Sequence, residues 1–170
     1  MNLYILRHGI AVDPGAPGYE IDSERPLIPK GERRLRSAAA AMEKMELSFD
    51  LILSSPFLRA RQTAEIVAGE LKLKKRLQFT DALACGGSMK NLIGLLAGLE
   101  SAPEGVLLVG HEPCLSRLIS LLVTGDADAA AVEMKKGGLC KLEVGELQLG
   151  QCARLAWLLT PSQMELMAQG

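Results

Sequence analysis

Four short apolar runs, each followed by a segment with helical spacing, constrain the fold of this chain more than any other feature. The runs cover residues 3–6, 50–54, 77–83 and 106–109. Runs of this length are typical of buried strands, whereas apolar residues spaced three and four apart form one face of a helix. Such spacing follows each run, in Leu35, Ala38, Met42 and Met45; Ala60, Ala64, Val67, Ala68 and Leu71; Met89, Leu92, Ile93 and Leu96; and Leu115, Leu118, Ile119 and Leu122. Alternating strands and helices predict an α/β fold with a mainly parallel central sheet.

The region after residue 124 lacks this alternation. Residues 139–144 and 153–159 have the composition of two strands joined by a turn around Gly145, which predicts an antiparallel edge to the sheet. Helices on both faces of that sheet would make a three-layer α/β sandwich. The length of the chain suits one domain over residues 1–170.

Local signals also place the starts of three helices. Ser55 before Pro56 predicts a cap followed by proline at the first helical position. Ser88 is expected to cap the next helix, and Pro113 to begin the one after it. The prolines and glycines in residues 14–29 predict a polar loop without regular structure.

Composition argues against several classes of protein. Nineteen basic and twenty acidic residues leave a net charge of −1, without the basic excess of many nucleic-acid binders. No apolar run approaches the ~18 residues of a membrane span, so neither nucleic acid nor membrane is an expected partner. The four cysteines are scattered, which indicates reduced thiols in a cytoplasmic protein, and the two histidines lie far apart. We therefore expect a cytoplasmic monomer with no metal and no cofactor.

Polar side chains follow three of the predicted strands at the point where each strand ends. Arg7 and His8 follow the first strand, Ser55 and Arg59 the second, and His111 the fourth. Because ligands of such sheets bind beyond the carboxyl ends of the strands, we expect these side chains to share one edge. Guanidinium groups bind phosphate oxygens through paired donors, and a helix beginning at residue 56 would add free N–H groups. The set predicts a cradle for a phosphoryl group.

His8 is the candidate nucleophile of this cradle. A neutral imidazole can attack phosphorus directly, because its ordinary pKa of about 6.5 leaves a lone pair exposed near pH 7. Gly9 would let the chain turn close to the phosphate, and His111 would donate to the phosphoryl oxygens. A histidine after a strand is more often structural, but the second histidine at an equivalent strand end favours function. Arg59 is expected to bind phosphate, and Arg61 to lie on the surface.

Four ordered segments resemble the histidine phosphatase superfamily, whose fold is phosphoglycerate mutase-like. Residues 6–9, Leu-Arg-His-Gly, are similar to its R-H-G signature, and residues 54–64, containing Ser-Pro-Phe-Leu-Arg-Ala-Arg-Gln-Thr-Ala, to its S-P-x-x-R-A-x-Q-T-A segment. Residues 109–113 resemble its second-histidine segment, and residues 25–31 its R-x-L-T-x-x-G stretch. The resemblance implies phosphate-pocket roles for Arg7, His8, Arg59 and His111, with His8 phosphorylated during turnover.

The short chain resembles the SixA branch, the protein phosphohistidine phosphatases, because few residues are spare for a lid. The resemblance implies that the partner is a phosphohistidine-bearing phosphotransfer or signalling protein. Many relatives carry a glutamate acid after the third strand, whereas here Asp81 is the only carboxylate between Glu70 and Glu100, slightly off the expected position. Asp81 is therefore only a candidate general acid. Two alternatives stay open: a small-molecule phosphomonoesterase or mutase, and a catalytically silent phosphoprotein-binding module.

Two basic clusters have functional and structural interpretations. Residues 30–36 contain Lys30, Arg33, Arg34 and Arg36, which could steer an acidic partner or simply form a solvated helix face. Lys135 and Lys136 could flank the pocket and attract phosphate, and similar residues recur in the SixA branch. Alternatively, they belong to a turn into the next strand.

Overall fold

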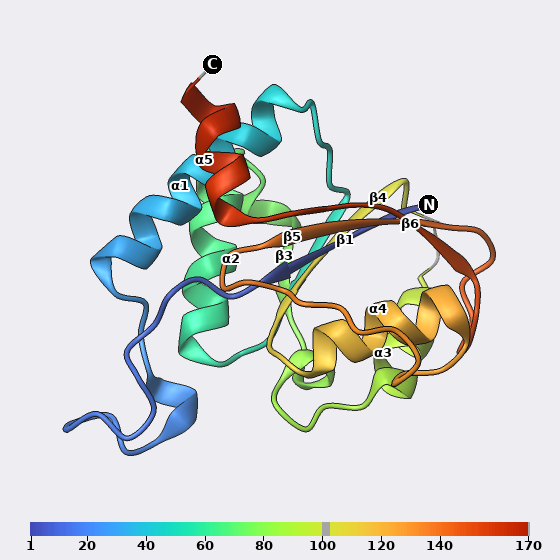
Figure 1. The fold of residues 1–170 in the computed structure, drawn as a ribbon, viewed down its shortest axis with the longest axis horizontal. Helices are drawn as coiled ribbons and strands as arrows, with labels where there is room; N and C mark the ends of the chain where they lie inside the picture. Colours follow the sequence, from blue (N-terminus) through green and yellow to red (C-terminus); the bar gives the residue numbers. More distant parts are fainter. Residues whose placement is uncertain (100–102, 170) are drawn as a thin grey trace.

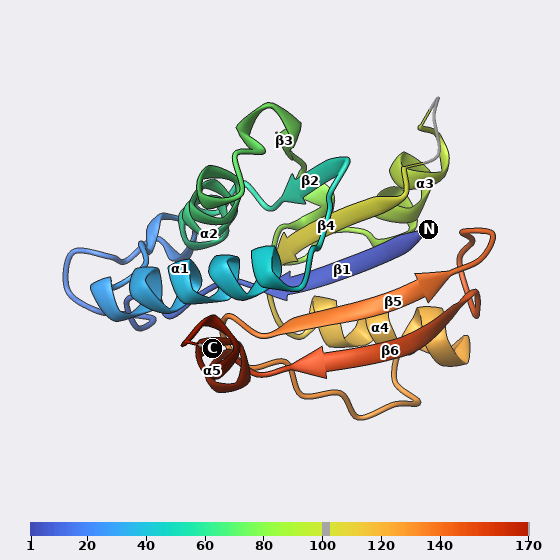
Figure 2. The same ribbon diagram turned by 90° about the horizontal axis from the view of Figure 1, so that it is seen from above.

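The computed structural model describes residues 1–99 and 103–169 (Figure 1). They form one six-stranded sheet with the strand order β3-β2-β4-β1-β5-β6 (Figure 2). The strands are β1 (Asn2–Arg7), β2 (Leu51–Ser54), β3 (Leu77–Phe79), β4 (Gly105–Gly110), β5 (Leu139–Val144) and β6 (Ala153–Leu159). The helices are α1 (Pro29–Lys44), α2 (Leu58–Glu70), α3 (Met89–Ala97), α4 (Cys114–Thr124) and α5 (Pro161–Gln169). Short 3-10 turns cover η1 (Asp22–Glu24), η2 (Lys74–Arg76) and η3 (Asp81–Leu83).

The sheet is parallel on one side and antiparallel on the other. Strand β4 pairs in parallel with β1 and β2, and β2 pairs in parallel with β3. Strand β5 runs antiparallel to both β1 and β6. All six residues of β4 are buried, as expected for a central parallel strand that is covered on both faces. The predicted mainly parallel sheet with an antiparallel edge is confirmed.

Helices cover both faces of the sheet and complete three layers (Figures 1 and 2). One apolar cluster joins α3 and α4 to one face, through residues such as Ile93 and Ile119. A second cluster joins α1, α2 and α5 to the opposite face, through Met42, Val67 and Met164. The predicted three-layer sandwich is therefore confirmed. No helix in the described parts of the chain is long and apolar enough to cross a membrane.

Two predicted helix starts are wrong, and in the first of them a contact with a distant residue holds the segment concerned. Helix α2 begins at Leu58 rather than at Pro56, with Phe57 as its cap. The Ser55 hydroxyl accepts a hydrogen bond from the Phe57 N–H at 3.2 Å and also contacts His111, so residues 55–57 form a turn instead of a first helical turn. Helix α4 begins after Pro113, which is its cap.

Of the other local predictions, the helix cap at Ser88 is confirmed, whereas the strand over residues 77–83 and the irregular loop over residues 14–29 need correction. Ser88 caps α3 as predicted, since its hydroxyl accepts from the Asn91 N–H at 3.2 Å. The strand predicted for residues 77–83 is too long: β3 ends at Phe79, and Thr80 then caps the turn η3 by accepting from the Ala82 N–H. The loop over residues 14–29 holds the short turn η1, which sequence reasoning missed.

Candidate functional site

The carboxyl ends of β1, β2 and β4 bring the predicted site residues to one edge of the sheet. Arg7 pairs in register with Gly110, and Ser54 pairs with Val109, so His8, Ser55 and His111 all follow at the same level. The rings of the two histidines lie 5.1 Å apart between centroids. The Nε of Arg59 lies 3.3 Å from the Nε2 of His8. The structure thus brings together side chains from three separate segments.

His8 has one ring nitrogen fixed as a donor and the other left as an acceptor. Its Nδ1–H donates to the Gly9 carbonyl at 2.7 Å, so Nε2 carries the lone pair, and the Arg59 Nε–H donates to that nitrogen. Only 6% of His8 is exposed, and burial lowers its pKa to about 3, although the Gly9 carbonyl opposes this shift. The imidazole is therefore neutral at pH 7 and suited to attack through Nε2.

The hydrogen bonding of Ser55 favours the same tautomer for His111, with the ring proton on Nδ1. The Nε2 of His111 lies 2.8 Å from the Ser55 hydroxyl oxygen, which already accepts from the Phe57 N–H. The hydroxyl proton is then free to be donated to Nε2, which leaves the ring proton on Nδ1. Within the described residues, this buried Nδ1 has no hydrogen-bond partner. Burial also lowers the pKa of His111 to about 4, so the ring is a neutral donor.

The arginines are held by groups that the sequence analysis did not identify. The guanidinium of Arg59 donates to the Asp22 carbonyl at 2.7 Å and to the Asp22 carboxylate at 2.9 Å. The same carboxylate accepts two bonds from Arg25. Burial opposes ionisation of Asp22, but the bonds from Arg25 and Arg59 outweigh it and lower its pKa. Arg7 donates to the Met134 carbonyl at 2.7 Å, and its buried Nε has no partner within the described residues.

Thr63 links the loop that carries His8 to the helix that carries Arg59. Its hydroxyl accepts from the Gly9 N–H at 3.1 Å and donates to the Arg59 carbonyl at 2.6 Å. A Cβ on Gly9 would lie 2.7 Å from the Cδ1 of Leu35, so any larger residue here would require the Leu35 side chain to move. Thr63 can be seen in the sequence beside Gln62, but no local signal predicts its hydrogen bonds to Gly9 and Arg59.

Asp81, the candidate general acid, is exposed at the start of η3 and has no hydrogen bond to His8, Arg59 or His111 within the described residues. From the segment that follows β3, the side chain that contacts Arg59 is Cys85, whose sulfur lies 3.7 Å from Arg59 Nη2. Among the described residues, no group of three or more histidine, cysteine, aspartate or glutamate side chains could hold a metal ion.

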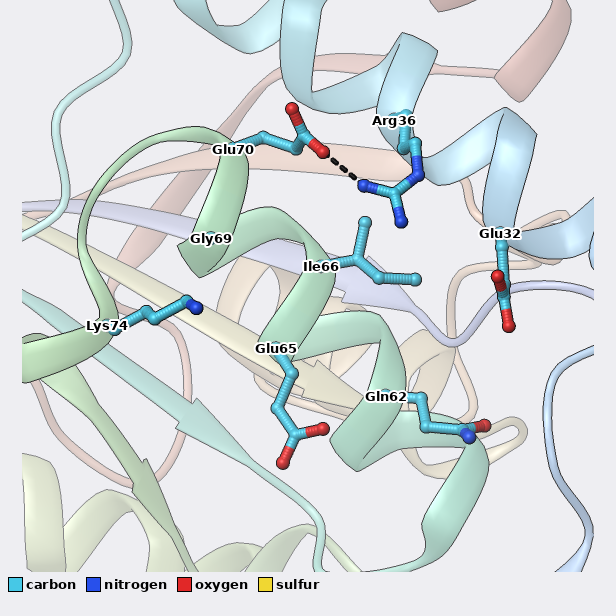
Figure 3. A pocket seen from close by; sticks show the side chains of 8 residues that line it. All are labelled: Glu32, Arg36, Gln62, Glu65, Ile66, Gly69, Glu70 and Lys74. Atoms are coloured by element: carbon cyan, nitrogen blue, oxygen red, sulfur yellow. Dashed lines mark hydrogen bonds and ion pairs between the residues drawn. The ribbon is translucent and has the colours of Figure 1, made fainter.

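A hollow of about 450 Å³ lies between α1 and α2, apart from these side chains (Figure 3). It is lined by Glu32, Glu65 and Glu70 together with Arg36 and Lys74. None of the four predicted pocket residues contributes to it. The hollow is therefore not a candidate for phosphoryl binding.

The lowered histidine pKa values predict that acid destabilises the fold. Unfolding restores the ordinary pKa of about 6.5, so the unfolded chain binds protons that the folded chain refuses, and the free energy of unfolding falls as pH falls. Between pH 7 and 5, each histidine should account for about 2 kcal/mol of this fall. Urea unfolding of wild type and His8→Asn, at pH 7 and at pH 5, measures this loss of free energy. Equal losses in the two proteins would contradict the lowered pKa of His8.

Comparisons with known proteins bear on this geometry. The family model for the histidine phosphatase superfamily (branch 1) matches residues 3–84. An uncharacterised protein of Picosynechococcus sp. is 39% identical over 150 residues, which are 88% of each chain. Phosphohistidine phosphatase SixA of Escherichia coli is 31% identical over 127 residues, which cover 74% of this chain and 76% of that protein.

Solved structures share the whole fold. A structure of the protein histidine phosphatase SixA complexed with tungstate has a TM-score of 0.83 and 26% identity, covering 95% of this chain and 98% of the other. The alpha-ribazole phosphatase of Shigella flexneri has a TM-score of 0.68 and 18% identity, covering 95% and 97%. The second likeness concerns the fold alone.

Proposed function

This chain belongs to the histidine phosphatase superfamily, and from that premise we propose that it removes the phosphoryl group from phosphohistidine on a phosphotransfer or signalling protein. The observation that carries the proposal is the neutral His8, whose Nε2 lone pair faces Arg59. A bond forms between this nitrogen and phosphorus as the bond to the leaving imidazole breaks. Water then attacks the phosphorylated His8, and inorganic phosphate leaves.

The arginines and His111 would stabilise charge on the phosphoryl oxygens during both steps. Arg7 has a buried Nε without a partner in the described chain, and His111 has a buried Nδ1 in the same condition. Donors of this kind act on a phosphoryl group without reorganising, which is where electrostatic catalysis gains most. Arg59 would turn its Nε–H from the His8 nitrogen to a phosphoryl oxygen as substrate enters.

The protonation states of the side chains at the site favour a nitrogen leaving group. Asp22 lies beside Arg59, but two arginines hold its carboxylate ionised, so it is a poor proton donor near pH 7. An alkoxide leaving group needs a positioned acid, often worth about 10²–10⁴-fold in rate. Imidazole leaves more easily, because its ring nitrogen can take a proton from water. The relationship to SixA supports the same substrate class.

A small-molecule phosphomonoesterase is the second candidate, because alpha-ribazole phosphatase has the same fold. The decisive experiment gives the wild type two substrates. One is a histidine-phosphotransfer domain that has been phosphorylated with phosphoramidate, and the other is p-nitrophenyl phosphate. We expect the phosphorylated domain to be hydrolysed with the higher kcat/KM. Strong ester turnover without action on the domain would favour the second candidate. Binding of the phosphorylated domain without turnover would indicate a silent binding module.

Replacing Ser55 with alanine should impair the reaction by freeing the tautomer of His111. We expect kcat to fall about tenfold, the equivalent of one lost hydrogen bond of about 1.4 kcal/mol, with little change in KM. The ¹⁵N NMR shifts of His111 should show loss of the Nδ1–H form. Ser54→Ala is the matched control, since the Ser54 hydroxyl is buried but donates to the Ser55 carbonyl. Identical shifts in wild type and Ser55→Ala would refute the role.

A further inference from the structure

A second hollow, of about 650 Å³, opens directly beside the proposed phosphoryl site. Arg7 lines it, together with Arg34 of α1, Lys135, Lys136 and the first residues of α5. Its volume lies within the range of sites that hold a ligand of several side chains' size. Arg7 lines this hollow and also belongs to the proposed phosphoryl site, so the two places adjoin.

Backbone hydrogen bonds attach the lysines to the loop of the nucleophile. The Gly137 N–H donates to the carbonyls of Arg7 and His8, both at 3.0 Å. The Arg7 N–H donates to the Gly138 carbonyl at 3.1 Å, and its guanidinium to the Met134 carbonyl at 2.7 Å. The segment 134–138 therefore keeps a fixed position next to His8. Lys135 and Lys136 belong to a turn into β5, and that turn also flanks the pocket.

The charges around this hollow are mainly positive. Four of its lining residues are cationic, whereas Glu133 is the only carboxylate among them. Arg34 forms an ion pair with Glu165, and Lys135 forms one with Glu133. Within the described residues, Lys136 has no ion pair, and it is exposed. Its ammonium group is therefore available to an incoming anion, and Arg7 adds a second positive charge at the inner end.

We propose that this hollow is the docking surface for aspartate and glutamate side chains that flank the phosphohistidine of the protein substrate. The inference rests on the proposed function and adds the sequence chemistry of the substrate. The carboxylates would face Lys136 while the phosphoryl group contacts Arg7 and His8. Opposite charges at such a rim speed the encounter of two proteins, and salt weakens the effect.

The test uses two synthetic peptides, each phosphorylated on a single histidine. The two residues on each side of that histidine are glutamates in the acidic peptide and glutamines in the neutral peptide. For wild type at low salt, we expect kcat/KM about tenfold higher for the acidic peptide, since rim charges act mainly through association. Lys136→Glu should remove or reverse this preference, and salt of about 0.5 M should largely abolish it in wild type. Turnover of p-nitrophenyl phosphate should stay unchanged in the variant.

Lys74→Glu is the matched control, because Lys74 is an exposed lysine in the hollow between α1 and α2 (Figure 3). The two variants have the same net charge, so a difference between them reports position. A preference that survives equally in Lys136→Glu and Lys74→Glu overturns the docking surface. So does a wild type that hydrolyses both peptides at equal rates, which leaves the proposed function intact. Hydrolysis of p-nitrophenyl phosphate with neither peptide accepted also overturns the docking surface, whereas the proposed function fails only if the phosphorylated domain is not hydrolysed either.

Discussion

Replacing His8 with alanine should lower kcat on every phosphorylated substrate by at least about 10⁴-fold, the scale seen when a covalent nucleophile is removed. No other imidazole can take over, since the chain has two histidines and His111 has its Nε2 engaged by Ser55. A second consequence is more diagnostic. Wild type quenched during turnover should carry phosphate in an acid-labile, alkali-stable bond, as expected for phosphohistidine, and His8→Ala should carry none.

His111→Ala is the control for this labelling experiment. That variant removes a proposed donor but leaves the His8 imidazole and its bond to the Gly9 carbonyl in place. We expect slower turnover with the phosphoryl label retained. The nucleophile assignment would be refuted if His8→Ala still became labelled, or if the label disappeared in His111→Ala alone. Near-ultraviolet circular dichroism would show whether each variant keeps its fold.

The architecture could be predicted because its signals are local and repeated. Apolar runs in residues 3–6 and 106–109 required strands buried on both faces, and spacing such as Leu115, Leu118 and Leu122 required helices. Once strands alternate with helices, the parallel direction of the strands follows from chain connectivity, although their order in the sheet does not. The carboxyl ends of these strands then meet at one edge of the sheet. That rule alone predicts that His8 and His111 lie at the same edge of the sheet.

What could not be predicted depends on contacts between distant segments. Helix α2 begins two residues later than its Ser-Pro signal indicates, because Ser55 bonds to His111 across 56 residues of sequence. Asp22 lies in a loop that composition marks only as irregular, yet its carboxylate holds both Arg59 and Arg25. Helix and strand propensities do not predict such pairs, since each polar partner alone could equally lie in solvent. These contacts determine which tautomers and charges the site presents.

Replacing Arg59 with alanine should have the second largest effect, a loss in kcat/KM of about 10³-fold, because a buried charged donor acts on the oxygens where charge accumulates. Only 3% of this side chain is exposed. Arg59→Lys should recover only part of the loss, since an ammonium lacks the paired donors of the guanidinium. Arg61→Ala is the matched control, because Arg61 is exposed and pairs with Glu65. Its kcat/KM should stay within about twofold of wild type.

The pH profile distinguishes a phosphate-binding role for Arg59 from a purely structural one. Arg59 is among the charges that lower the pKa of His8 and of His111. Without it, both rings should take up protons at higher pH, so the acid limb of kcat/KM for Arg59→Ala should move upward. A misfolded variant would lose activity without this shift. If Arg59→Ala kept the wild-type rate, the arginine would serve Asp22 alone, and the phosphoryl cradle would be reduced to Arg7 and His111.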